Sequence, residues 1–304
     1  MIYLVTILTT NNIDLLTLSI MSALNQLYTN YHLYIIVNTL NDTYLEEVIN
    51  LCKNKFPNKI ERIIRTESNG RPGKGHNSLI KIFNESDYDY LIMCDGDDFL
   101  YPTALLRINN LIVKNNYDLI ALIGNPSKII TSPYNIQEQS SLSERRHILT
   151  KEITIEKKNL NINNISTDYN TILATPCRLV FINKTLSKKY TNLYDEGMYV
   201  YDDYRAFLKI YEDYVQQTHS ICFLNDAYIY MYNGFNSNSV SKSNSNVGKL
   251  ADHEIFKSYN INKLDVSKIN IILNNEFSTI EWENIDSFER TIMNLYRIYH
   301  EKQI

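Results

Sequence analysis

The sequence predicts an α/β fold with a mostly parallel central sheet flanked by helices. In residues 1–124, short apolar runs alternate with amphipathic segments in units of about thirty residues, the pattern of strands joined by helical crossovers. One run, residues 90–94, is apolar throughout and fits a strand buried on both faces. Residues 125–240 are less regular, and residues 241–304 end in a helical pattern. We therefore expect a regular half, a less regular half of the same domain, and a helical C-terminal extension.

The first units of the chain follow the strand and helix pattern closely. Residues 2–8 predict a strand, and a polar turn separates it from an amphipathic helix. Residues 32–37 predict a second strand, and Asp42 can cap the helix that follows. Residues 60–64 predict a third, weaker strand because charged residues flank them. This order indicates parallel strands with right-handed crossovers.

A basic, glycine-rich segment, ESNGRPGKGHNSL, leads into the next helix. Its glycines and basic residues are Gly70, Gly73, Gly75, Arg71 and Lys74. A P-loop would need glycine in place of Ser68 and Ser or Thr in place of Gly75, and a dinucleotide GxGxxG motif fails on spacing. A flexible basic turn at a helix N-terminus suits a diphosphate. A connecting loop that is merely rich in glycine is the alternative.

An acidic turn follows the apolar strand at residues 90–94. Asp95, Asp97 and Asp98 fall within four residues, Gly96 lets the backbone turn, and Pro102 is a natural first residue of a helix. Crowded carboxylates at the carboxyl end of a parallel strand suggest a divalent cation with oxygen ligands, Mg²⁺ or Mn²⁺. The alternatives are a helix cap at Asp98 and a solvated acidic turn. An EF-hand loop is excluded because leucines occupy its sixth and twelfth positions.

The second half contains weaker signals. Residues 118–123 predict a strand, residues 125–170 are polar and fit a binding loop or lid, and residues 176–182 predict another buried strand. Residues 220–224 and 227–232 predict a pair of strands joined by an Asn-Asp turn. The regular pattern of the first half therefore resumes only in pieces.

Two acidic residues mark the start of a late helix. Asp202 and Asp203 precede apolar positions at helical spacing, which fits a functional carboxylate pair or simple stabilisation of the helix dipole. Residues 235–248 are rich in Ser and Asn and predict a mobile loop that could close over a site. Residues 285–299 carry an apolar stripe at helical spacing, which favours packing on the body over a membrane or partner face.

Composition limits the possible partners. The chain has 304 residues, 30 basic and 34 acidic, and a net charge of −4, which favours neither nucleic acid nor an anionic membrane. No apolar run is long enough to span a bilayer, and the N-terminus lacks a basic leader, so we expect a cytoplasmic protein. Reduced, buried thiols are expected at the widely spaced Cys52, Cys94, Cys177 and Cys222.

Taken in order, these segments resemble a family 2 glycosyltransferase with a GT-A fold, over about residues 1–240. The opening VTILTTNNIDLLTLSIMSALNQ resembles the first strand, nucleotide turn and helix of that family. SNGRPGKGHNSL resembles its NxGxxxxRN-type segment, with His76 where Arg is common. MCDGDDFLYP resembles the DxDD motif, VYDDYRAFL the ED motif, and YIYMYNGFNSNSVS the terminal hairpin with its Ser-containing tail.

The resemblance implies that residues 1–124 bind a nucleotide sugar. Thr9 and Asn11 would line the nucleoside pocket, and Arg71 and Lys74 would lie near the diphosphate. The acidic residue usual at the end of the second strand is Asn38 in this chain, so a uracil contact would persist only through an amide.

For the chemistry, the resemblance implies roles for four carboxylates. Asp95 would contact the ribose and lie beside the metal, and Asp97 would ligate Mn²⁺ or Mg²⁺. Asp203 would be the catalytic base, with Asp202 in place of the family's Glu, in the acceptor-binding half at residues 125–240. The expected reaction is metal-dependent, inverting transfer of one sugar, of the hexosyltransferase type. The donor would be a UDP-sugar or another nucleotide-diphosphate sugar, and the acceptor would be a hydroxyl of a glycan or other molecule.

Two further departures from the family pattern bear on function. The missing QxxRW signature of processive members implies transfer of a single sugar, and the His often found after the late hairpin is absent, which leaves Asn233 or the distant His253 as metal neighbours. Asn38 and the missing His keep other functions open. A catalytically silent member that binds sugar nucleotide or glycan is one alternative. A sugar nucleotidyltransferase is the other, although its Gly-rich basic loop after the first strand is replaced by TTNNID. The sequence predicts nothing about the oligomeric state.

Overall fold

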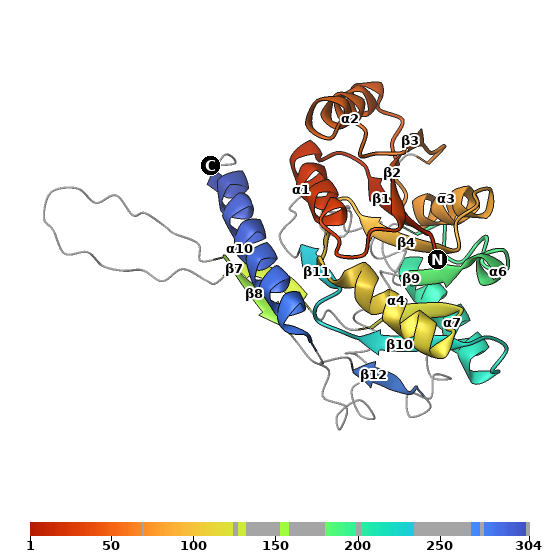
Figure 1. Ribbon diagram of the computed structural model, residues 1–304. Helices are drawn as coiled ribbons and strands as arrows, with labels where there is room; N and C mark the ends of the chain where they lie inside the picture. Colours follow the sequence, from red (N-terminus) through yellow and green to blue (C-terminus); the bar gives the residue numbers. More distant parts are fainter. Residues whose placement is uncertain are drawn as a thin grey trace, which may run out of the picture.

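The computed structural model describes residues 1–68, 70–123, 127–131, 153–157, 180–198, 202–233, 269–273 and 277–301. Within these residues, eight strands form a central sheet (Figure 1). They are β1 (Tyr3–Thr9), β2 (Tyr31–Val37), β3 (Arg62–Arg65), β4 (Tyr90–Asp95), β6 (Leu119–Leu122), β9 (Val180–Asn183), β10 (Ile221–Asn225) and β12 (Ile271–Leu273). Their order across the sheet is β12-β10-β6-β9-β4-β1-β2-β3. Neighbouring strands are parallel except at β9, which runs antiparallel between β4 and β6. The predicted α/β class and mostly parallel sheet are confirmed.

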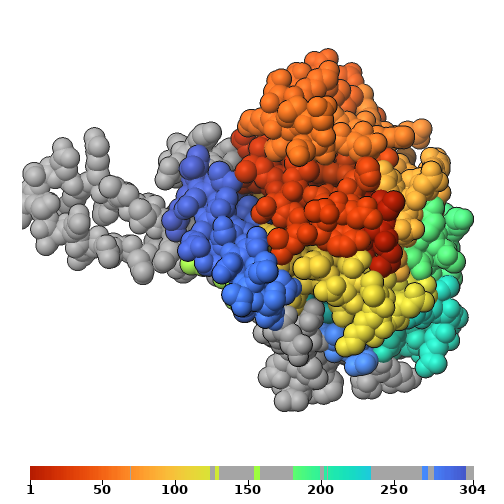
Figure 2. Space-filling model, in the orientation of Figure 1, coloured from red at the N-terminus to blue at the C-terminus, as the bar shows by residue number. Residues whose placement is uncertain are grey.

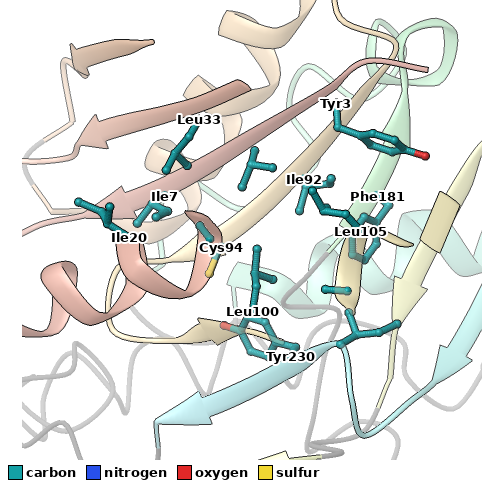
Figure 3. Packing of buried hydrophobic residues seen from close by; sticks show 14 of the residues in the cluster. Tyr3, Ile7, Ile20, Leu33, Ile92, Cys94, Leu100, Leu105, Phe181 and Tyr230 are labelled. Carbon is teal, nitrogen blue, oxygen red and sulfur yellow. The ribbon is translucent and has the colours of Figure 1, made fainter. Parts of the chain in front are cut away.

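Helices cover both faces of this sheet, as the alternating pattern predicts. The described helices are α1 (Ile13–Leu24), α2 (Asp42–Lys55), α3 (Pro72–Asn84), α4 (Ala104–Asn115), α6 (Lys184–Ser187), α7 (Asp202–Val215) and α10 (Thr279–Glu301). One core cluster joins α1, α2 and α4 to one face, and another joins α3, α6 and α7 to the opposite face. Figure 3 shows the first cluster, in which Ile92 and Cys94 of β4 lie near Ile20 and Leu105.

A second, smaller sheet includes the short strand that follows β4 and the acidic turn in the chain. Its strands, in the order β5-β11-β7-β8, are β5 (Phe99–Leu100), β11 (Tyr230–Asn233), β7 (Ser127–Thr131) and β8 (Ile153–Lys157). Figure 2 shows α10, in blue, on the surface beside the red N-terminal part of the chain. The apolar stripe of α10 packs beside the small sheet and α1, with Ile285, Phe288 and Ile292 in the same buried cluster as Phe99 and Leu15. The C-terminal helix therefore packs on the body, as its stripe predicts.

The predicted pairing of the strands at residues 220–224 and 227–232 is wrong. Both strands exist, but β10 joins the central sheet parallel to β6, and β11 joins the small sheet antiparallel to β5. The two turn residues between them are buried and bonded to other elements. Asn225 donates from Nδ2 to the Ile123 carbonyl at 2.9 Å, and Asp226 binds Arg107. The chain therefore crosses from one sheet to the other at this point.

Two predicted helix starts also differ from the structure. The cap of α2 is Asn41, whose side chain accepts from the Tyr44 amide, whereas Asp42 lies inside the helix and pairs with Arg65. Pro102 does not open α4, which begins at Ala104, because Pro102 and Thr103 form a turn before the helix. Residues 241–304 supply an edge strand, β12, in addition to α10.

The cysteine prediction holds where the structure describes it. Cys52, Cys94 and Cys222 are buried free thiols, and burial raises the pKa of Cys52 to about 11 and that of Cys222 to about 12. Cys177 and the loop predicted at residues 235–248 lie outside the described residues.

None of the described helices combines the length and apolar composition needed to cross a membrane.

Candidate active site

The acidic turn lies at the end of β4, next to the end of β1. The Gly96 amide donates to the Leu8 carbonyl at 2.7 Å, and the Asp98 amide donates to the Asp95 carbonyl at 3.1 Å. A Cβ at Gly96 would lie 2.9 Å from both the Leu8 carbonyl oxygen and the Thr9 Cβ, so glycine permits the close approach of turn and strand. The turn leaves the side chains of Asp95 and Asp97 partly exposed at the carboxyl edge of the sheet.

The third aspartate of the turn has a structural place. Asp98 is fully buried, and its carboxylate accepts from the Tyr230 hydroxyl and, at 2.7 Å, from the Asn233 amide. It thereby fastens β11 to the turn, so the helix-cap alternative for Asp98 is wrong. Only Asp95 and Asp97 of the predicted acidic cluster remain at the edge of the sheet.

The glycine-rich segment leads into a helix as predicted, but Gly73 and Gly75 lie inside that helix rather than in a flexible turn. Helix α3 begins at Pro72, so Lys74 lies in its first turn and Arg71 is the residue before it. A Cβ at Gly73 would lie 2.0 Å from the Asp195 carbonyl oxygen, and one at Gly75 would lie 2.6 Å from Asn38 Nδ2. These two glycines therefore serve close packing rather than backbone freedom.

Helix α3 holds the segment at residues 193–198, which leads toward α7. Asn77 Oδ1 accepts from the Tyr194 amide and its Nδ2 donates to the Tyr194 carbonyl, both at 3.0 Å. Arg71 donates from a guanidinium nitrogen to the Gly197 carbonyl at 2.7 Å. Arg71, which was expected near the diphosphate, and Asn77 on α3 thus both contact the chain before the late helix.

His76 joins the two halves of the predicted site. Its Nε2 lies 3.1 Å from Asp95 Oδ1, and its Nδ1 lies 3.4 Å from Asp202 Oδ2. Burial alone would lower the pKa of His76, but the carboxylates of Asp202 and Asp95 outweigh it and raise the pKa to about 10. At neutral pH the ring is therefore a cation between two carboxylates.

Sequence reasoning did not assign roles to His76, Asn77 or Tyr194. A signal for His76 exists, because it falls on the apolar face of α3 with Leu79, three positions on, and Phe83, seven positions on. A polar side chain on such a face needs a buried partner. The identity of those partners depends on the tertiary fold.

Two of the predicted nucleoside residues lie at the carboxyl ends of strands, Thr9 as the last residue of β1 and Asn38 directly after β2. Thr9 shares a hydrogen bond of 2.5 Å with the Tyr44 hydroxyl. Asn38 accepts from Thr66 Oγ1 at 2.8 Å and donates from Nδ2 to the Arg71 carbonyl at 3.1 Å, with 1% of the residue exposed. This carbonyl contact fixes the orientation of the Asn38 amide, because a carbonyl only accepts.

The remaining predicted residues differ in their exposure. Asn11 is exposed in the turn after β1, and Asp203 is partly exposed beside the buried Asp202 at the start of α7. Asn233 is buried and accepts from the Tyr296 hydroxyl at 2.7 Å, and His253 lies outside the described residues. In the part of the chain that the structure describes, no three His, Cys, Asp or Glu side chains gather in a way that could hold a metal ion.

Solved structures share this architecture. Residues 1–349 of S. aureus TarS in complex with UDP-GlcNAc match with a TM-score of 0.51 and 17% identity over 81% of this chain and 62% of that chain. The mannosyltransferase PcManGT from Pyrobaculum calidifontis, in complex with GDP-Man and Mn²⁺, matches with a TM-score of 0.51 and 10% identity over 78% of this chain and 58% of that chain. This chain thus spans about three fifths of each structure's length, and the likeness at this identity concerns the fold.

No curated protein matches the chain. The sequence does match the model of the family described as Glycosyl transferase family 2, over residues 4–180, which is more than half of the chain. That match includes β1, the acidic turn and α3. The chain belongs to glycosyl transferase family 2.

Proposed function

We propose that this protein is a metal-dependent, inverting glycosyltransferase that transfers one sugar from a nucleotide-diphosphate sugar, with UDP as the expected nucleotide, to a hydroxyl of a glycan or other acceptor. The observation that carries the proposal is the joining of the acidic turn to the start of α7 through His76. This contact supports a single site that contains both the proposed donor residues and the proposed base. Family membership supports the same reaction class.

The donor site is proposed at the carboxyl ends of β1, β2 and β4. Thr9, Asn11 and Asn38 would face the nucleoside, with Asn38 offering an amide in place of a carboxylate. Arg71 and Lys74, at the N-terminus of α3, would lie near the diphosphate, where side-chain charge and the positive end of the helix dipole both favour an anion. TarS in complex with UDP-GlcNAc supports a nucleotide sugar in this fold.

The carboxylates present fit a hard divalent cation that arrives with the nucleotide. Asp97 is partly exposed, and the Asp95 side chain is 29% exposed although one of its oxygens faces His76. Mg²⁺ and similar ions often take only one or two protein carboxylates and complete their shell with phosphate and water. Asp97 and Asp95 would hold Mn²⁺ or Mg²⁺, which would neutralise charge on the leaving diphosphate. PcManGT in complex with GDP-Man and Mn²⁺ supports this choice.

Asp203 is the proposed general base. Asp202 is 7% exposed and directed at His76, whereas Asp203 is partly exposed at the first turn of the same helix. A positioned carboxylate can take the proton of an acceptor hydroxyl as it attacks the anomeric carbon. Attack from the face opposite the leaving diphosphate inverts the configuration. The acceptor would be bound by residues 125–240.

Sugar release and transfer from UDP-sugars, with Mn²⁺ present, test this function in the wild type and in Asp203→Ala. We expect Asp203→Ala to lower kcat by about 10²- to 10⁴-fold while nucleotide binding persists. Glu212→Ala, an exposed change on the same helix, serves as the matched control and should retain activity. Equal turnover by Asp203→Ala and wild type would refute the role of Asp203.

A silent binding member of the family is the second candidate. It is favoured by Asn38, whose amide already bonds Thr66 and the Arg71 carbonyl. This candidate predicts UDP binding without turnover on any sugar nucleotide. Pyrophosphate release from a nucleoside triphosphate and a sugar phosphate would instead indicate a nucleotidyltransferase.

A further inference from the structure

His76 contacts carboxylates from two elements that are distant in the sequence. Asp95 ends β4 in the donor half, and Asp202 begins α7 in the acceptor half. The two ring nitrogens reach them at 3.1 Å and 3.4 Å respectively. A single side chain thus spans the interval between the proposed donor site and the helix that carries the proposed base.

This contact is enclosed on its other sides. His76 is 8% exposed and Asp202 is 7% exposed. The Tyr194 ring lies against the imidazole with 4.6 Å between centroids, and α3 approaches so closely that a Cβ at Gly73 would lie 3.2 Å from the Asp202 Cβ. Packing therefore limits both the ring and the first residue of α7 to a narrow range of positions.

The contact from Nδ1 is the less complete of the two. His76 Nδ1 and Asp202 Oδ2 are both buried, and neither makes a hydrogen bond of good geometry to any residue in the described ranges. A buried donor and acceptor facing each other at 3.4 Å can form a hydrogen bond after a small shift.

We propose that His76 is a positioning residue that sets the first turn of α7, and with it Asp203, relative to the acidic turn. This inference rests on the proposed function, in which Asp203 acts as the base. Asp202 then serves as the attachment point of α7, and Asp203 takes the proton. A base displaced by about 1 Å can lose about 100-fold in rate, so the effect should fall on the chemical step.

Steady-state kinetics of His76→Gln and His76→Arg test the proposal. Glutamine fills a similar space but cannot reach both carboxylates, so kcat should fall by about 100-fold while the donor KM changes by less than about threefold. Arginine presents a fork of donors that can bridge two carboxylates, so it should recover at least tenfold of that loss. His32→Gln is the matched control, since His32 pairs with the exposed Glu61 at 3.4 Å and lies against the Tyr88 ring, and it should match wild type.

A double-mutant cycle with Asp202→Asn identifies the route of the effect. If His76 acts through Asp202, the double variant should be no more than about threefold slower than the slower single variant. If the two substitutions lowered kcat by factors that multiply in the double variant, the proposal would be overturned. It would also be overturned if the kcat of His76→Gln were within twofold of wild type. A loss of kcat that His76→Arg does not recover would also overturn it.

If wild type transfers sugar from no nucleotide sugar, the proposed function fails on its own, and the position of α7 is then compared in crystals of wild type and His76→Gln. Displacement of the Asp202 carboxylate by about 1 Å or more supports the positioning role. An unmoved carboxylate and helix overturn it.

Discussion

Neighbouring aspartates in the acidic turn have opposite environments. Asp98 is fully buried and binds the Tyr230 hydroxyl and the Asn233 amide, whereas Asp97 is partly exposed at the edge of the sheet. One carboxylate therefore belongs to the fold and the other to the proposed site. Their spacing in the sequence alone does not separate these roles, since the DGDD pattern allows any of its members to turn inward.

Asp98→Ala should lower the free energy of unfolding by about 3 kcal/mol, because it leaves two buried donors without their acceptor. Asp97→Ala should change it by less than about 0.5 kcal/mol. Urea unfolding of both variants measures the difference. Equal stability of the two variants would contradict the assignment.

The pKa of His76 also predicts a pH-dependent stability. The folded-state pKa of His76 is about 10 and the ordinary value is 6.5. The contribution of the charged His76 ring to the free energy of unfolding is therefore complete below pH 6.5 and is lost as pH rises through about 10. The advantage of wild type over His76→Gln in free energy of unfolding should shrink by up to about 1.4 kcal/mol per pH unit in that window. Chemical denaturation at pH 6, 8 and 10 measures it, and a constant difference would count against the paired imidazolium.

Helix α3 is the element that most changes the interpretation of the site. Gly73 and Gly75 allow it to contact the Asp195 carbonyl and the Asn38 side chain, and Asn77 holds Tyr194. Its apolar positions predict a helix correctly. Its starting point could not be predicted, because a glycine needed for close packing and one needed for a flexible loop look alike in a sequence.

Gly73→Ala should destabilise the protein by about 3 kcal/mol, since its Cβ would overlap a backbone carbonyl 2.0 Å away. Gly197→Ala is the matched control: its Cβ would meet only Asp195 Oδ1, at 3.3 Å, the end of a side chain. We expect a change of less than about 1 kcal/mol there. Thermal and urea unfolding compare the two, and a harmless Gly73→Ala would refute the packing role.

Across the whole molecule, the buried Arg107 connects α10 to the body in addition to the apolar stripe of that helix. Arg107 on α4 binds Asp226 at 2.7 Å and approaches Glu281 of α10 at 3.4 Å. Its guanidinium carbon also lies 4.1 Å from the centroid of the Phe277 ring. The connection thus joins the central sheet, the crossing between β10 and β11, and the C-terminal helix.

Arg107→Met should lower the free energy of unfolding by about 3 to 5 kcal/mol, because it leaves the buried Asp226 carboxylate without its cationic partner. The double variant Arg107→Met/Asp226→Asn should regain part of that loss. Arg290→Met removes an exposed pair with Asp286 and should change stability by less than about 0.5 kcal/mol. Urea unfolding of this series would contradict the account if Arg107→Met behaved like Arg290→Met.

The sequence allowed the class of fold, the order of the first strands and helices, and the position of α7 to be predicted, because each rests on local periodicity and turn residues. The crossing at Asn225 and Asp226 could not be predicted. Adjacent strands with a turn between them usually pair. Here the two turn residues are hydrogen-bonded to Ile123 and Arg107, which are about 100 residues away in the chain. The contacts of His76 with Asp95 and Asp202 could not be predicted for the same reason, because they also depend on the tertiary fold.

The most direct test of the central claim is a thermal-shift and unfolding measurement with UDP, with and without Mn²⁺, on wild type and Asp97→Ala. At about one hundred times Kd, UDP with Mn²⁺ should stabilise wild type by about 2.7 kcal/mol, and removal of the metal or of the Asp97 carboxylate should abolish most of that gain. No stabilisation of wild type, or the same stabilisation in Asp97→Ala, would contradict a metal-assisted diphosphate site at the end of β4.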